Sequence, residues 1–208
     1  WLNYAQTCTD FVNQTTGNVT ISSNLLVNNM LDLHSGSLIL NGFDLTVNGV
    51  IITSSGASIT GSVTSDLTLD GNGNCSLAFS PGSEVLQSLV ISQLNSTVVL
   101  QSDLAVENVI SLLQGSLALN DHNLSVNGTL NTLAGASITG SSASGLILNG
   151  MGNVSLAFSP NGPLLGTFVV HQTNGTVALN SDLTVDSSLQ LQQGTLALNG
   201  YDLTINAT

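Results

Sequence analysis

An internal repeat of 79 residues organises most of this chain. The segment 24–102 aligns without a gap to the segment 103–181, with identical residues at about 41 of the 79 positions, and a partial third copy covers 182–208. A repeat unit of this kind cannot bury its apolar face alone, so successive units stack and share one continuous core. The repeat therefore restricts the fold to an array of stacked units.

The array extends upstream of the first complete copy. The segment 17–23 matches the end of each later period, which places the start of the array at residue 17. We divide the chain into a repeat array over 17–208 and a separate segment 1–16. We expect this N-terminal segment to cap the array or to join one subunit to another.

Within each period, short runs of alternating apolar and polar residues are separated by Asn and Gly. Leu45-Thr46-Val47 is one such run, followed by Asn48-Gly49. Period-two alternation predicts β-strands, and Asn and Gly favour the turns between them. The sequence thus predicts an all-β protein, either a parallel β-solenoid (β-helix) or tandem immunoglobulin-like β-sandwiches. We favour the solenoid, because each period contains smaller units of similar sequence that stacked coils would produce.

Charge excludes several classes of partner. The chain has no Lys or Arg and 12 Asp plus Glu, which gives a formal net charge of −12. Without cations it cannot neutralise phosphates, so we expect no binding to nucleic acid or to anionic lipid. Because no continuous apolar run reaches about 18 residues, we also expect no insertion into a membrane.

The titratable residues do not form a recurring catalytic set. Several enzymes that cleave polysaccharides share the β-helix fold, but they need clustered carboxylates or a basic residue. Here Asp66 and Asp70 are replaced by Gly145 and Asn149 in the second copy, and none of the three histidines recurs. We therefore expect a protein that is not an enzyme, with no catalytic residue.

We likewise expect no cofactor and no bound metal. Asp70 to Asn74 has the spacing of half a calcium loop, but the second copy has fewer oxygen ligands and no bidentate Glu follows, which favours a Gly-rich turn. The histidine of the second copy, His122, aligns with Phe43 and Tyr201. We expect these three rings to stack at one corner of successive periods.

The two cysteines and three large aromatic residues suggest how subunits could join. Cys8 and Cys75 show no spacing typical of zinc ligands, and a disulfide between them, within a chain or between chains, is one hypothesis. Because each end of a solenoid exposes unpaired backbone and apolar side chains, we expect segment 1–16 to contact another copy. Its apolar anchors would be Trp1, Tyr4 and Phe11, with Cys8 as a covalent link.

Several Asn-x-Ser/Thr sequons predict N-glycosylation of a secreted protein. Three of them, at Asn18, Asn95 and Asn174, come just before the same recurring strand. We expect a glycan at one or more of these corners.

Some stretches of the repeat carry a resemblance to known proteins. GSLILNGFDLTVNG (36–49), GSLALNDHNLSVNG (115–128) and GTLALNGYDLTIN (194–206) resemble β-strand repeats of large secreted bacterial surface proteins, of the adhesin-like and filament-like Bacteroidetes type. The resemblance implies export, a β-helical fold and a role in adhesion, surface layers or fibres.

We therefore predict a structural subunit of an extracellular filament or surface fibre, joined head to tail to copies of itself at the cell surface. A passive adhesin stalk or glycan-binding module is the alternative, and a polysaccharide-active enzyme is a more distant one.

Overall fold

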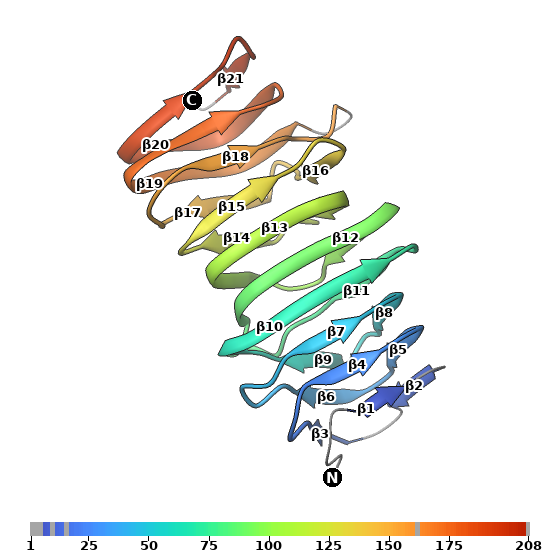
Figure 1. Ribbon diagram of the computed structural model, residues 1–208. Helices are drawn as coiled ribbons and strands as arrows, with labels where there is room; N and C mark the ends of the chain where they lie inside the picture. The colour runs from blue at the N-terminus through green and yellow to red at the C-terminus, as the bar shows by residue number, and fades with distance from the viewer. Residues whose placement is uncertain (1–5, 9–10, 15–16, 161–162, 207–208) are drawn as a thin grey trace.

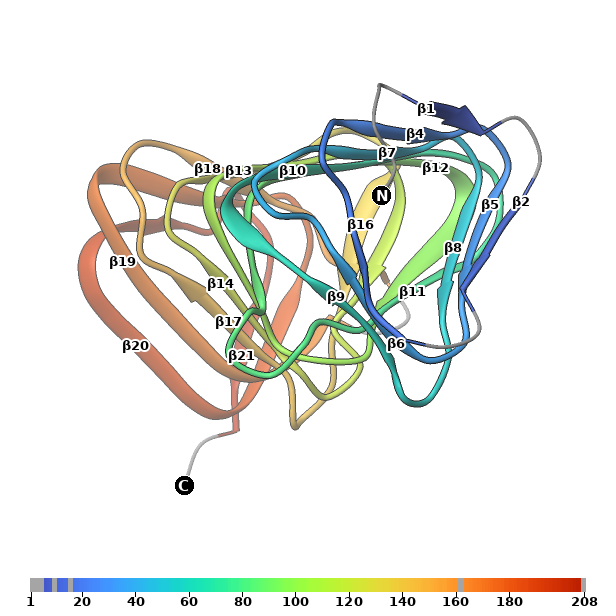
Figure 2. The same ribbon diagram turned by 90° about the horizontal axis from the view of Figure 1, so that it is seen from below.

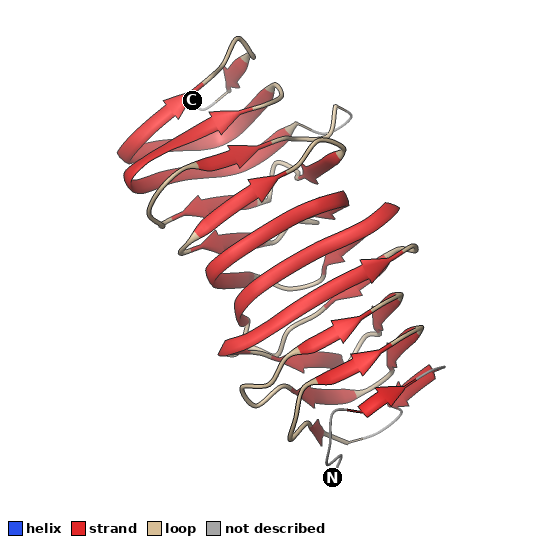
Figure 3. Cartoon of the chain, viewed as in Figure 1, coloured by secondary structure: helices blue, strands red, loops and turns tan. Residues whose placement is uncertain are grey.

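The computed structural model describes residues 6–8, 11–14, 17–160 and 163–206. Within these residues the protein is all-β, and its parallel strands wind into a β-solenoid of about nine turns (Figures 1 and 3). This confirms the predicted solenoid and excludes tandem immunoglobulin-like sandwiches, which are built from antiparallel sheets. The described ranges contain no helix with the length and apolar character needed to cross a membrane.

Each of the first turns has three faces, and Figure 2 shows their three-sided outline along the axis. We name the faces A, B and C in the order in which the chain visits them. Face A begins with β1 (Gln6–Cys8), β4 (Leu25–Val27) and β7 (Leu45–Val47), face B with β2 (Phe11–Gln14), β5 (Met30–Leu33) and β8 (Val50–Thr53), and face C with β3 (Val19–Thr20), β6 (Gly36–Ile39) and β9 (Ala57–Thr60).

The later turns contain longer strands that bend around the corners. β12 places Leu89 beside Leu67 on face A and Val98 beside Cys75 on face B. These strands are β10 (Ser62–Gly71), β11 (Cys75–Leu77), β12 (Val85–Leu100), β13 (Leu104–Ala118), β14 (Asn123–Val126), β15 (Thr129–Thr132), β16 (Ala136–Thr139), β17 (Gly145–Leu148), β18 (Val154–Leu156), β19 (Leu164–Leu179), β20 (Leu183–Ala197) and β21 (Leu203–Ile205).

The core is a set of apolar columns inside the coil. On face A, Leu25, Leu45, Leu67 and Leu89 are register partners in four successive turns, and all are buried. Alternate residues of each strand point inward, which is the alternation that the sequence shows. Branched aliphatic side chains therefore stack on their own kind along the whole axis, and the burial of this apolar surface stabilises the fold.

The corners use glycine in two different ways. At the corner after β6, Asn41 and Gly42 both have positive φ, 54° and 85°, which Gly and Asn tolerate best. Gly128 has no such backbone, but a Cβ there would overlap the carbonyl oxygen of Asn108 in the preceding turn. Asn-Gly pairs that look alike in the sequence thus have different roles. Some supply a backbone with positive φ, and others let adjacent turns approach closely.

One 79-residue repeat does not complete a whole number of turns. Leu25 lies on face A, beside Leu45, whereas its equivalent Leu104 lies on face C, in register with Leu124. The next equivalent, Leu183, pairs with Leu203 on face B. Equivalent residues of successive repeats are therefore displaced around the axis by one face each time.

This displacement corrects one expectation about the aromatic rings. Phe43 precedes face A, His122 precedes face C and Tyr201 precedes face B, so they lie at three different corners. The prediction that they stack on one another is wrong, because an alignment of repeats gives equivalence in sequence and not position around the axis.

Candidate functional site

The last described turn presents an apolar surface at the end of the solenoid, which we call the end face. It is formed by β20 and β21 at the C-terminal end of the described solenoid (Figure 1). Leu191 is 58% exposed, Leu198 39% and Ile205 50%, although each occupies an inward position of the repeat. Apolar surface exposed at inward positions is available for contact with another chain.

The preceding repeat shows how the end face would look when covered. The equivalents of Leu191, Leu198 and Ile205 are 79 residues earlier, at positions where the side chains are at most 1% exposed. The next turn lies over those equivalents: Leu112 is in register with Thr132, Val126 is in register with Leu148, and the amide of Leu119 donates to the carbonyl of Thr139. The end face is therefore shaped to receive one more turn of the same kind.

The backbone at the end face is also available for pairing. In the described part of the chain, the segment 188–197 of β20 pairs with β19 on one side and has no strand on the other. Unpaired N–H and C=O groups along a strand edge pair readily with another strand. Hydrogen bonding and apolar burial consequently favour the same event, the addition of a parallel turn.

The opposite end of the described solenoid is built from β1, β2 and β3. Each of these strands pairs in parallel with the turn above, and each is the outermost strand of its sheet in the described ranges. The solenoid therefore reaches into the segment 1–16 that we assigned to a cap or joint. Its role in capping or joining remains a prediction.

Of the predicted anchors, Trp1 and Tyr4 lie outside the described residues. Cys8 ends β1 on face A and Phe11 begins β2 on face B, so the backbone of both belongs to the first turn. Their role as anchors remains a prediction.

The predicted Cys8–Cys75 bridge within one chain is not formed. Cys75 is a free, buried thiol on β11, and burial raises its pKa above the ordinary value of 9.0, although a hydrogen bond from the amide of Ile51 opposes that rise. Cys8 is in register with Val27, Val47 and Leu69, three turns before the turn of Cys75. At about 4.8 Å per turn this separation exceeds the Cα distance that a disulfide spans.

The carboxylates recur at corners, where they accept hydrogen bonds from the next turn. Just before equivalent strands of each repeat, an Asp or Asn side-chain oxygen accepts a hydrogen bond from a backbone N–H in the following turn, with nitrogen–oxygen distances of 2.8–3.0 Å. The three pairs are Asn24 with Asp44, Asp103 with Asn123, and Asp182 with Asp202. Asp and Asn are interchangeable in this role because each offers a side-chain oxygen as acceptor.

The histidines and acids are spread along the solenoid. His34 lies 3.0 Å from Asp32, and His122 lies 3.5 Å from Asp103. Within the described ranges, no three His, Cys, Asp or Glu side chains are grouped to hold a metal ion.

The three predicted glycosylation sites lie at three different corners of the solenoid. Asn18 is between faces B and C, Asn95 between A and B, and Asn174 between C and A, and all three are exposed. Asn95 and Asn174 share a left-handed backbone with φ of 54° and 56°. The displacement of one face per repeat thus distributes equivalent asparagines around the rod.

The comparisons with known proteins add no family to this description. No protein family, curated protein or solved structure matches the chain. The resemblance to Bacteroidetes-type surface repeats therefore remains a prediction.

Sequence reasoning missed one buried polar residue that the repeat encodes. Gln93 is fully buried at the corner after face A, where its amide donates to the carbonyl of Gly49 at 3.0 Å, and its equivalent Gln172 is also fully buried. The segment 11–17, FVNQTTG, aligns with 169–175, VVHQTNG, and places Gln14 at the same position. That alignment would have extended the array into segment 1–16.

Proposed function

We propose that this protein is a structural subunit of an extracellular filament, in which the first turn of one copy stacks on the end face of another. The observation that carries the proposal is that a following turn buries Leu112, Leu119 and Val126, so a turn from another copy can bury their equivalents Leu191, Leu198 and Ile205 in the same way. A head-to-tail contact between unlike surfaces does not close on itself and produces a linear polymer.

The two ends fit this arrangement in the direction of their strands. The end face offers parallel strand edges, and β1, β2 and β3 offer parallel edges at the other end. A joint of this kind would extend the ladder of backbone hydrogen bonds without reversing strand direction, as adjacent turns do within one chain. A rod of about nine turns adds on the order of 40 Å of length per subunit.

The amino-acid composition supports an extracellular location for such a filament. The chain contains no Lys or Arg, so proteases that cleave after these residues find no site in it. Scattered carboxylates, hydroxyls and amides on the outward faces keep the rod hydrated. We propose cell-surface localisation and self-association on these grounds.

The test is electron microscopy of the purified 208-residue chain over a concentration series. We expect unbranched filaments above a critical concentration, with a width equal to one solenoid. Single short particles at every concentration would overturn the proposal.

A second candidate is a passive adhesin stalk that binds glycans along its side. Rows of outward hydroxyls support it, because Ser58 lies 2.9 Å from Ser37 and 2.8 Å from Ser80 in adjacent turns, oxygen to oxygen. A neutral row of hydroxyls suits a polyhydroxylated ligand. Binding to a glycan array by protein that does not polymerise would favour this candidate over the filament.

A further inference from the structure

A ridge of exposed leucines follows one corner of the solenoid. Leu94, Leu113 and Leu133 lie at the corner between faces A and B in three successive turns, and they are 54%, 37% and 53% exposed. Leu133 directly follows Leu113 in the stack, because its amide donates to the carbonyl of Leu112. We call these three residues the leucine ridge.

The leucine ridge occurs once along the repeat array, with Leu94 near the end of the first copy and Leu113 and Leu133 in the second. The equivalent residues 79 positions earlier are Thr15, His34 and Ser54, and those 79 positions later than Leu94 and Leu113 are Thr173 and Gln192. Three separate positions are thus leucine together, and the fold places them at one corner in successive turns. An apolar strip along a lateral corner marks a contact.

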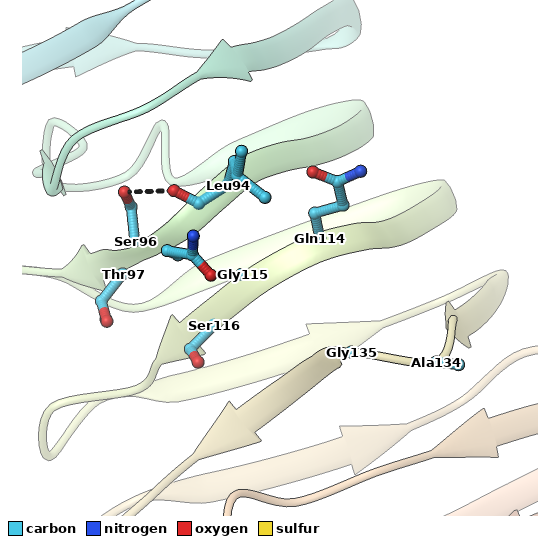
Figure 4. Close-up of a pocket in the computed structure, with 9 residues that line it drawn as sticks. Leu94, Ser96, Thr97, Gln114, Gly115, Ser116, Ala134 and Gly135 are labelled. Carbon is cyan, nitrogen blue, oxygen red and sulfur yellow. Dashed lines mark hydrogen bonds between the residues drawn. The ribbon is translucent and has the colours of Figure 1, made fainter.

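A shallow groove of about 440 Å³ runs beside the ridge (Figure 4). Its lining comes from three successive turns and includes Leu94, Gln114, Ser116 and Ala134, with Gly135 leaving open space at its edge. The volume lies within the range of about 300–1,000 Å³ that small-ligand sites occupy.

The lining is free of charged side chains, although the chain carries a net charge of −12. Amide and hydroxyl groups stand next to the apolar surfaces of Leu94 and Ala134. This combination suits a neutral carbohydrate, whose hydroxyls can bond to Gln114 and Ser116 and whose C–H faces can cover the leucines.

The groove contains its own attachment point for such a carbohydrate. Asn95 lines the groove, is exposed, and begins the sequon Asn95-Ser96-Thr97. Its left-handed backbone is fixed by the corner, and the hydroxyl of Ser96 donates to the carbonyl of Leu94 at 2.9 Å (Figure 4). A sugar joined to Asn95 would start inside the groove, where attachment gives it a high effective concentration.

We propose that Asn95 carries an N-linked oligosaccharide whose first sugars lie in the groove and cover the leucine ridge. This inference is independent of the proposed filament, since it concerns one lateral corner and not the end face. Asn174 supplies a matched control, because it has the same backbone conformation and an equivalent sequon but stands beside Thr173.

The first test is whether Asn95 is modified. Peptides of the protein isolated from its source, cut at aspartate because the chain lacks Lys and Arg, should show a glycan on Asn95 by mass spectrometry. An unmodified Asn95 overturns the proposal.

The second test measures how closely the sugars pack. The chain is secreted from a eukaryotic host that glycosylates sequons, and the native protein is treated with peptide-N-glycosidase. We expect release from Asn95 to be about tenfold slower than from Asn174, and the triple variant Leu94→Thr, Leu113→Gln, Leu133→Ser to remove the difference. These replacements are the residues that stand at equivalent positions of the other copies. Equal rates at the two sites in the unaltered chain contradict the packing.

Dye binding gives a third and separate readout. Thr97→Val removes the sequon of Asn95, and Thr176→Val removes that of Asn174, each with a β-branched residue that suits the strand. We expect an apolar dye to fluoresce severalfold more with the Thr97→Val protein and no more with the Thr176→Val protein. No increase, or dimerisation of the Thr97→Val protein through the ridge, would assign the ridge to another occupant and overturn the proposal.

Discussion

A single carboxylate on the end face should weaken assembly strongly. Leu198 is 39% exposed, and its equivalents Leu40 and Leu119 are fully buried beneath a following turn. Complete burial of a leucine contributes about 1.5–3 kcal/mol, so the joint should gain about 1 kcal/mol from this side chain. With Leu198→Asp that gain is lost, and a carboxylate enters the joint in a polymer whose copies contain no Lys or Arg to pair with it.

An unpaired buried charge costs about 3–5 kcal/mol. The sum of at least about 4 kcal/mol corresponds to an association constant roughly 10³-fold lower, and the critical concentration should rise by the same factor. Folding itself should change little, because the side chain is already partly exposed at the end of the rod. Sedimentation velocity across a concentration series measures the shift.

The control for this substitution is Met151→Asp. Met151 is 72% exposed on a lateral corner, and the change adds the same charge to the subunit. We expect this protein to polymerise like the unaltered chain. Assembly of the Leu198→Asp protein at an unchanged critical concentration, or equal failure of both proteins, would refute the end-face reasoning.

Three further predictions follow from the solenoid. Cys75→Val should leave stability within about 1 kcal/mol at neutral pH, since Val154 occupies the equivalent position. Burial raises the pKa of Cys75 in the folded state, so the thiol of the unfolded chain ionises first as the pH rises. The unaltered protein should therefore lose stability above pH 9.0. Urea unfolding should show a smaller loss in the Cys75→Val protein. Salt should promote assembly by screening the net charge, with the Debye length falling from about 30 Å at 0.01 M to about 10 Å at 0.1 M; a requirement for calcium at constant ionic strength would contradict this. Gly128→Ala should destabilise the fold by about 3 kcal/mol or more, because the new Cβ meets the carbonyl of Asn108. Gly56→Ala enters open space and should cost only about 1–2 kcal/mol, because of the positive φ of Gly56. Equal shifts of the two melting temperatures would argue against the close contact at Gly128.

The fold could be predicted from the sequence because its determinants are local and repeated. Alternation such as Leu45-Thr46-Val47 encodes which side chains point inward, and the repeat encodes the stacking. The position of each residue around the solenoid axis could not be predicted, because it depends on how many residues each corner contains. The long corner from Ser92 to Thr97, for example, holds the buried Gln93. Alignment therefore placed Phe43, His122 and Tyr201 together although they lie at three corners.

The candidate sites were predictable to different degrees. Exposed ends follow from any solenoid, so the sequence anticipated an assembly surface, but it pointed to segment 1–16 and not to Leu191, Leu198 and Ile205. The sequence pattern predicts these three residues to be core, and they are exposed because no further turn follows them in the described part of the chain. The leucine ridge was hidden for a related reason, since Leu94, Leu113 and Leu133 come to the same corner only when the chain is wound into successive turns.

The most direct test of stacking between subunits is a cryo-electron microscopy reconstruction of the assembled 208-residue chain at a resolution that separates strands. We expect an uninterrupted ladder of strands about 4.8 Å apart across each subunit boundary, with Leu191 and Leu198 of one copy beneath β1 to β3 of the next. Subunits that touch only along their sides, or particles that remain at 21.2 kDa at high concentration, would contradict it.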